Sequence, residues 1–189
     1  MHAHTRGGLR GTSLMTLLSA ALLITATACG PASTTRLAQT APSTQQVVLD
    51  PETRLRQNID QVASTFIGAT YVYGAKGPST FDCSGFTSHV LRNFDISLLG
   101  SSMSQAKQGR SIPIASAQPG DLVYFKNKSG RVNHVALVVA NGQAGLEVIH
   151  ATTSRGVVRD NVSESSYWSP RLAGARCVVD CRVGLAAAY

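Results

Sequence analysis

The chain has 189 residues, of which 43% are hydrophobic and 14% are charged, and its formal net charge is +7. This length suits one domain with appended segments, and this composition excludes a long coiled coil and a disordered acidic chain. No stripe of Lys and Arg interleaved with aromatic residues indicates nucleic-acid binding, so we expect no nucleic-acid partner.

Residues 1–28 have the character of a signal peptide. Arg6 and Arg10 form a positive end, and residues 14–28 are apolar or small, a stretch too short for a membrane span. Two processing routes are open. In the first, Ala26 and Ala28 form a small-x-small cleavage site that releases a soluble periplasmic or secreted product.

The second route, which we favour, lipidates Cys29. Ala28-Cys29 resembles the lipobox of bacterial lipoproteins, although Ala26 stands where lipoboxes usually have Leu. Gly30 after the Cys resembles an outer-membrane address in Gram-negative cells, so we predict a lipoprotein on the periplasmic face of the outer membrane. Residues 29–49, rich in Ser, Thr, Ala, Gln and Pro, then form the lipidated N-terminus and a flexible tether with a span of roughly 25 Å.

Residues 50–189 are predicted to form the folded domain, which begins with helices. Asp50-Pro51 supplies a capping carboxylate and a proline at the first helical position, and an apolar stripe follows as far as Gly68. Asp82 is a plausible N-cap for a second helix over 83–94. Residues 102–109 are expected to form a short third helix.

Strands are predicted after Pro119-Gly120. They cover 122–125, 135–139, 146–151, 156–158 and 176–183, and the continuous apolar run 135–139 is typical of a strand buried on both faces. Helices followed by an antiparallel sheet indicate an α+β fold. Cys177 and Cys181 both fall in the last predicted strand, where a straight strand separates their Cα atoms by roughly 13 Å. A disulfide therefore requires a turn between them, and both a bridge and two thiols stay open.

Cys83 is the candidate nucleophile. It begins the second predicted helix, where exposed N–H groups and the positive end of the helix dipole are expected to lower a thiol pKa. A buried, inert Cys is the alternative. His134 begins the apolar strand after a polar loop, a place suited to a general base at a pocket rim or to an ordinary structural His.

A hairpin would bring a second imidazole beside His134. With the turn at Asn141-Gly142, both His134 and His150 lie eight residues from Gly142, so they would be directly opposite on one face, with Cβ atoms roughly 5 Å apart. A bulge would shift this register. A nucleophile, a base and an orienting group form a triad. Zinc binding by the same three residues is the rival reading, weakened by the lack of short ligand spacings.

Four motifs carry a family resemblance, together with Tyr71-Val72-Tyr73-Gly74. They are Asp82-Cys83-Ser84-Gly85-Phe86, Pro119-Gly120-Asp121-Leu122, Asn133-His134-Val135-Ala136-Leu137 and Ile149-His150-Ala151. Their order and content resemble the NlpC-type family of papain-like cell-wall cysteine peptidases. The resemblance extends from about residue 54 to residue 177. Ala75 departs from it, because the family usually has a second Gly there.

The resemblance implies a role for each site residue. Cys83 would be the nucleophile, His134 the base and later the acid, and His150 the orienting residue. Tyr71 would help to hold the oxyanion. Asp82 and Ser84 would contact the substrate peptide or act only as helix cap and first-turn residue.

The resemblance also implies the function. We expect a monomeric hydrolase of peptidoglycan stem peptides or cross-links, of the DL-endopeptidase type, with no cofactor and no metal. The papain-like domain would carry the Cys on N-terminal helices and the two His on an antiparallel sheet. A module that binds wall peptide without cutting it, and acyl transfer by the same triad, are the competing functions.

Overall fold

The computed structural model describes residues 49–179, so the predicted signal peptide, Cys29, nearly all of the tether and Cys181 lie outside the described residues. The first half holds α1 (Pro51–Ser64), β1 (Thr70–Tyr71), β2 (Thr80–Phe81), α2 (Cys83–Arg92), α3 (Ser102–Gln105) and β3 (Arg110–Ile112). The second half holds β4 (Leu122–Lys126), β5 (Val132–Gly142), β6 (Gly145–Thr152), β7 (Gly156–Asn161) and β8 (Leu172–Cys177). Single 3₁₀ turns, η1 (Ile114–Ser116) and η2 (Ser169–Arg171), precede β4 and β8.

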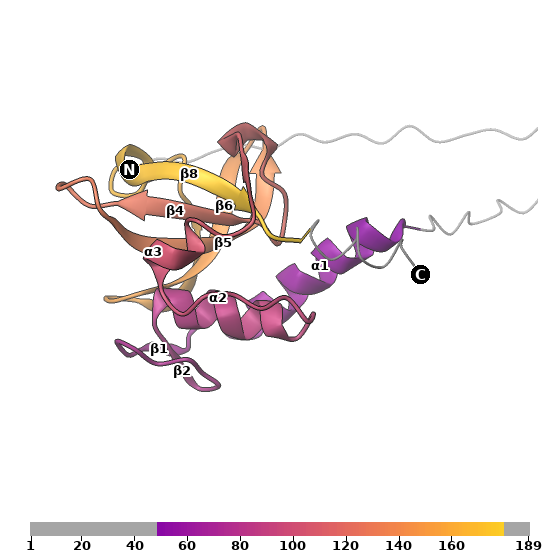
Figure 1. The fold of residues 1–189 in the computed structure, drawn as a ribbon, viewed down its shortest axis with the longest axis horizontal. Coiled ribbons are helices and arrows are strands. Elements are labelled where there is room, and N and C mark those ends of the chain that lie inside the picture. Colours follow the sequence, from indigo (N-terminus) through magenta and orange to yellow (C-terminus); the bar gives the residue numbers. More distant parts are fainter. Residues whose placement is uncertain (1–48, 180–189) are drawn as a thin grey trace, which may run out of the picture. The chain divides into compact units, whose positions relative to one another are not determined.

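Six strands form one antiparallel sheet in the order β3-β8-β4-β5-β6-β7, and β1 and β2 form a separate parallel pair. Helix α2 packs against β5 and β6 on one side of the sheet (Figure 1). The predicted α+β, papain-like arrangement is therefore confirmed, with the Cys on a helix and both His on the sheet. None of the helices within residues 49–179 is long and apolar enough to span a membrane.

The predicted burial of β5 on both faces is also confirmed. Val135 and Leu137 join the core between the helices and the sheet, whereas Ala136 and Val138 join a second core on the opposite face. Alternate residues of a strand point to opposite faces, so an unbroken apolar run is what two cores require. The strand that carries His134 is thereby packed on both faces, one against each core.

Helix α1 is fastened to the start of β4. Asp50 caps the helix by accepting from the backbone N–H groups of Glu52 and Thr53. One turn further on, buried Arg56 donates to the carbonyl of Pro119 at 2.8 Å and to Asp121 at 3.1 Å. The Pro119-Gly120-Asp121 motif of the sequence thus ties helix to sheet.

The predicted register of the β5–β6 hairpin is wrong by two residues. Leu137 pairs with Ile149 and Val138 with Val148, and an irregularity follows between Val138 and Ala140. The turn lies between Gly142 and Gly145, later than expected, which shifts the pairs next to the turn by three residues, and the irregularity reduces this shift to two. Because the shift is an even number, His134 and His150 still share one face, as diagonal rather than opposite neighbours.

The last predicted strand, over 176–183, starts too late, because β8 begins at Leu172 and ends at Cys177, and residues 180–183 lie outside the described residues. Small residues give its first half little strand propensity. Packing accounts for one of them: a Cβ on Gly174 would lie 2.3 Å from the Tyr124 hydroxyl. The local pattern could not reveal this requirement, and β3, which pairs with β8, has no predicted counterpart.

Candidate active site

A pocket of about 490 Å³ opens where the N-terminus of α2 meets the start of β5 and the end of β6. Cys83 and His134 both line it, as does Tyr71, so the structure brings together three of the residues selected from the sequence. His150 lies directly behind His134 and is fully buried. The other lining residues are Asn133, Ala151, Thr152, Thr153, Ser154, Arg155, Ser165, Tyr167, Trp168 and Arg171.

Cys83 is the first residue of α2 and is 9% exposed. Burial raises the pKa of its thiol, and this outweighs the backbone N–H groups of Val135 and Ser84, which favour the thiolate. The expectation that the helix N-terminus would lower this pKa is therefore wrong, because loss of hydration opposes the charged form more strongly than the local dipoles favour it. Cys83 is therefore a thiol at rest, and it would need a base in order to act as a nucleophile.

A line of hydrogen bonds leads away from the pocket through two imidazoles to a carboxylate. His134 Nε2 lies 3.1 Å from His150 Nδ1, and His150 Nε2 lies 3.0 Å from Asp160 Oδ2. Arg155 in turn donates to both oxygens of Asp160, with Nη1 at 2.8 Å from Oδ1. Asp160 follows from the register of β6 and β7: His150 pairs with Val158, and Asp160 is the next residue on that face.

The ionised carboxylate determines where every proton in this line sits. Hydrogen bonds from Arg155 and His150 hold the pKa of Asp160 well below its usual range, so Asp160 can only accept. The proton of neutral His150 is therefore on Nε2, and its Nδ1 must accept. His134 then donates from Nε2, which leaves Nδ1 of His134 without a proton and available to take one from Cys83.

Aromatic rings cover the two imidazoles of this line. The indole of Trp168 stacks on His134, with ring centroids 4.6 Å apart and planes inclined by 25°, and its centroid lies 4.9 Å from that of His150. Phe125 flanks both Trp168 and His134. Burial, and secondarily the neighbouring His150, lower the pKa of His134 to about 3. Both His134 and Cys83 are therefore uncharged at neutral pH.

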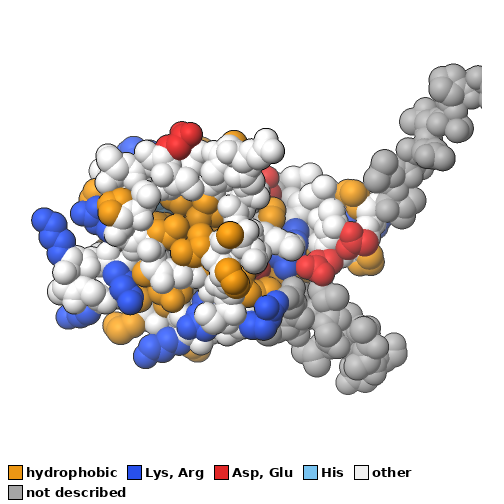
Figure 2. Space-filling view, turned by 90° about the horizontal axis from the view of Figure 1, so that it is seen from above, with side chains coloured by type: hydrophobic (Ala, Val, Ile, Leu, Met, Phe, Trp, Pro, Cys, Tyr) orange, Lys and Arg blue, Asp and Glu red, His pale blue; other side chains and the backbone are white. Residues whose placement is uncertain are grey.

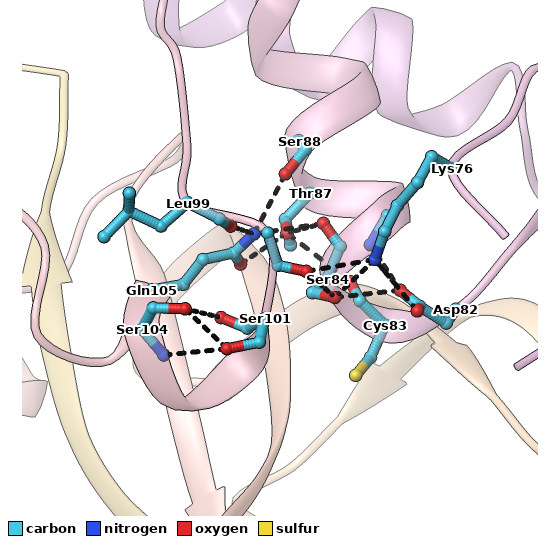
Figure 3. Close-up of polar contacts among 12 residues, drawn as sticks. Lys76, Asp82, Cys83, Ser84, Thr87, Ser88, Leu99, Ser101, Ser104 and Gln105 are labelled. Atoms are coloured by element: carbon cyan, nitrogen blue, oxygen red, sulfur yellow. Dashed lines mark hydrogen bonds and ion pairs between the residues drawn. The ribbon is translucent and has the colours of Figure 1, made fainter. Parts of the chain in front are cut away.

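Asp82 and Ser84 belong to a polar cluster on the other side of Cys83. Asp82 caps α2 by accepting from Gly85 N, and Lys76 Nζ lies 3.0 Å from both Asp82 Oδ2 and Ser84 Oγ. Figure 3 shows the Cys83 sulfur pointing away from this cluster. Both Asp82 and Ser84 are buried, so their contact with a substrate peptide stays a prediction.

Gly85 allows the loop that follows Tyr71 to lie against α2. A Cβ at this position would lie 2.1 Å from the carbonyl oxygen of Ala75, which itself accepts from Asp82 N at 2.9 Å. Ala75 thus fills the position where the family usually has Gly without breaking this contact. The Cys-Ser-Gly sequence therefore determines the position of the loop after Tyr71 as well as that of Cys83.

A model of the NlpC/P60 family matches residues 68–177, more than half of the chain. The chain belongs to the NlpC/P60 family. The probable endopeptidase NlpC of Escherichia coli is 35% identical over 134 residues, which cover 67% of this chain and 84% of that protein. The predicted family membership is confirmed.

Further NlpC/P60 relatives are similar over this domain. The probable endopeptidase p60 of Listeria grayi is 42% identical over 112 residues, 59% of this chain and 20% of that protein. The gamma-DL-glutamyl hydrolase of Bacillus subtilis is 37% identical over 118 residues, 60% of this chain and 28% of that protein. The chain thus spans about a fifth of the length of the p60 relatives.

A solved structure of a lipoprotein-like NlpC/P60 protein from Staphylococcus aureus superposes with a TM-score of 0.57 and 32% identity. The match covers 71% of this chain and 44% of that one. The NlpC/P60 domain is therefore the part of the molecule in which these proteins agree.

The sequence motifs do not include three residues of this site. Asp160 and Arg155 were not selected, because they lie in an ordinary polar strand and turn. Alternation along β7 would have placed Asp160 on the His150 face once the β6–β7 register was known. Trp168 lies outside the sequence motifs, and it lines the pocket.

The rival zinc reading finds no support in the geometry. The two imidazoles turn ring nitrogens toward each other at hydrogen-bonding distance, rather than toward a third point. Within residues 49–179, no group of three or more His, Cys, Asp and Glu side chains is arranged to hold a metal ion.

The proton assignment predicts the effect of Asp160→Ala. Loss of the carboxylate removes the acceptor that keeps the His150 proton on Nε2, so His150 is expected to become a mixture of tautomers. Its pKa is expected to fall further, because Asp160 raises it against the lowering effect of burial. Nitrogen-15 NMR of the imidazoles measures both quantities. Glu164→Ala, an exposed change outside the pocket, is the control, and an unaltered His150 tautomer in Asp160→Ala would contradict the assignment.

Proposed function

We propose that the chain is an exported cysteine endopeptidase that hydrolyses amide bonds of peptidoglycan stem peptides or cross-links. One observation carries this proposal: Cys83 lines the same pocket as His134, an imidazole whose proton position is set by His150 and ionised Asp160. The names of the p60, NlpC and gamma-DL-glutamyl relatives support the same class of activity.

The proposed first step is acylation of Cys83. As Cys83 Sγ attacks the scissile carbonyl carbon, the thiol proton passes to His134 Nδ1. The oxyanion that forms accepts hydrogen bonds from the backbone N–H of Cys83 and from the hydroxyl of Tyr71. Burial raises the pKa of Tyr71, which keeps this hydroxyl a donor.

Acylation ends when His134 gives its proton to the leaving amine and the C–N bond breaks, which leaves the acyl group on Cys83 as a thioester. Deacylation follows. Water then attacks the thioester with His134 as base, and the thiol re-forms as the acid product leaves. In both steps His150 stabilises the imidazolium of His134 through the bond to Asp160, so the group that receives charge is already oriented.

The bond proposed as substrate is a DL amide, such as γ-D-glutamyl–diaminopimelate. The B. subtilis relative is named for this type of linkage. A digest of purified muropeptides, analysed by mass spectrometry before and after treatment, identifies the bond. Release of no peptide fragment, with binding retained, would instead favour a module that holds wall peptide without cutting it.

Substitutions test the triad. Cys83→Ala and His134→Ala are each expected to abolish hydrolysis, because the nucleophile and its base act as a unit. His150→Ala is expected to lower kcat by about 100-fold, because it orients the base without accepting the proton from Cys83. His89→Ala is the matched control, since His89 lies on α2 against Phe66 and Phe81 and does not line the pocket. Turnover by Cys83→Ala would contradict the assignment.

The pH dependence of the rate tests the state of the base. His134 must be neutral to accept a proton, and a pKa lowered to about 3 keeps it neutral as the pH falls through 6.5. The value of kcat/KM is therefore expected to be retained from pH 7 to pH 5, with circular dichroism confirming the fold at each pH. A fall in kcat/KM centred near pH 6.5 would show instead that the base titrates like a solvated His.

We also propose that Cys29 is lipidated and tethers the domain to a membrane. The sequence Ala28-Cys29 supports this, as does the similarity to a lipoprotein-like relative. Intact-mass analysis is expected to find an acylated Cys29 at the mature N-terminus, and Cys29→Ser is expected to move the protein from the membrane fraction to the soluble fraction. Cleavage before an unmodified Cys29 would favour the soluble route.

A further inference from the structure

The wall of the catalytic pocket carries positive charge that the triad does not use. Its lining residues include Arg155 and Arg171, and none of the residues that line it is Asp or Glu. The positive charge of Arg155 is compensated by Asp160, because both of its terminal nitrogens contact that carboxylate. Arg171 differs: within residues 49–179, no carboxylate forms an ion pair with it.

Arg171 is held in place by groups that do not neutralise it. Its Cζ lies 3.9 Å from the centroid of the Tyr167 ring, and Nη1 donates to the backbone carbonyl of Tyr167 at 2.5 Å. The same short segment carries Trp168, which stacks on His134. The guanidinium is therefore positioned relative to the proposed base, and little side-chain entropy remains to be lost when it binds an anion.

A second hollow continues the positive surface on the other side of Arg171. It has a volume of about 400 Å³, and Lys126 and Lys128 line it together with Arg171. None of its lining residues is acidic. Lys and Arg side chains gather at the left-hand end of the molecule in Figure 2, where Figure 1 places the turn between β4 and β5. The field along this path favours an anionic ligand beside the pocket.

We propose that Arg171 is the subsite that binds a free substrate carboxylate next to the scissile amide. The inference rests on the proposed function, and it narrows the substrate class to stem peptides whose carboxylates are not amidated. A guanidinium binds a carboxylate through charge-assisted N–H···O bonds, which a neutral carboxamide replaces only in part.

The chemistry of the proposed substrate supplies such a group at the required place. A residue linked through its side-chain carboxyl, as in a γ-D-glutamyl amide, keeps a free α-carboxylate a few bonds from the scissile carbonyl. Diaminopimelate on the amine side carries carboxylates too. Both residues would present the same ligand, a carboxylate, and selective amidation of one or the other distinguishes them.

The test measures binding to the Cys83→Ala protein by calorimetry, so that it does not depend on turnover. Three synthetic peptides serve as probes: L-Ala-γ-D-Glu-diaminopimelate, the same peptide amidated at the D-Glu α-carboxyl, and the same peptide amidated at diaminopimelate. We expect one of the two amidated peptides to bind about tenfold more weakly than the peptide that is not amidated. Adding Arg171→Gln is expected to abolish that difference, and adding Arg92→Gln, an exposed arginine at the far end of α2, to preserve it.

The outcomes separate the inference from the function on which it rests. An Arg171-dependent loss with either amidated peptide supports the site and identifies the side of the scissile bond. Equal affinity for all three peptides, or a difference that survives Arg171→Gln, would overturn it. Parallel digests with the wild-type protein test the function itself: if none of the peptides is cleaved, the proposed endopeptidase activity fails, while the calorimetry still decides the role of Arg171.

Discussion

The hydrogen bond between Asp160 and His150 is the interaction on which the rest of the site depends. An ionised carboxylate can only accept hydrogen bonds, so His150 donates to Asp160 and His134 donates to His150. Nδ1 of His134 is therefore left without a proton. Without the carboxylate, each imidazole could adopt either tautomer, and half of the arrangements would present an N–H to the thiol. Arg155 completes the line by holding Asp160 in its ionised form and in its orientation.

Burial sets the electrostatic character of the same site. Trp168 and Phe125 cover the imidazoles, and burial shifts the thiol and the base toward their neutral forms. In the proposed mechanism, charge then develops only when a substrate is attacked, in surroundings whose donors and acceptors are already oriented. Preorganised groups of this kind stabilise a charged transition state without the reorganisation that water would require.

The fold serves the site by bringing five separate segments to one pocket. Gly85 lets the loop after Tyr71 lie on α2, and Arg56 ties α1 to the start of β4. The segment before β8 contributes both the ring that covers His134 and the cation beside it. One short piece of chain thus carries both the ring that covers His134 and the proposed carboxylate subsite, which would link substrate choice to the position of the proposed base.

The sequence by itself determined the class of fold, the family, and the positions of Cys83, His134 and His150 on a helix start and two neighbouring strands. The helix start is a local feature, because Asp82 caps the helix at short range. His134 and His150 share one face because the observed register differs from the expected one by an even number of residues. Only the tertiary structure decided the register of the hairpin, the partnership of His150 with Asp160, and the place of Trp168 and Arg171. The physical reason is that a pattern of apolar residues encodes which face is buried. The distance between two polar atoms on that face depends on turn lengths, bulges and packing that the whole domain sets.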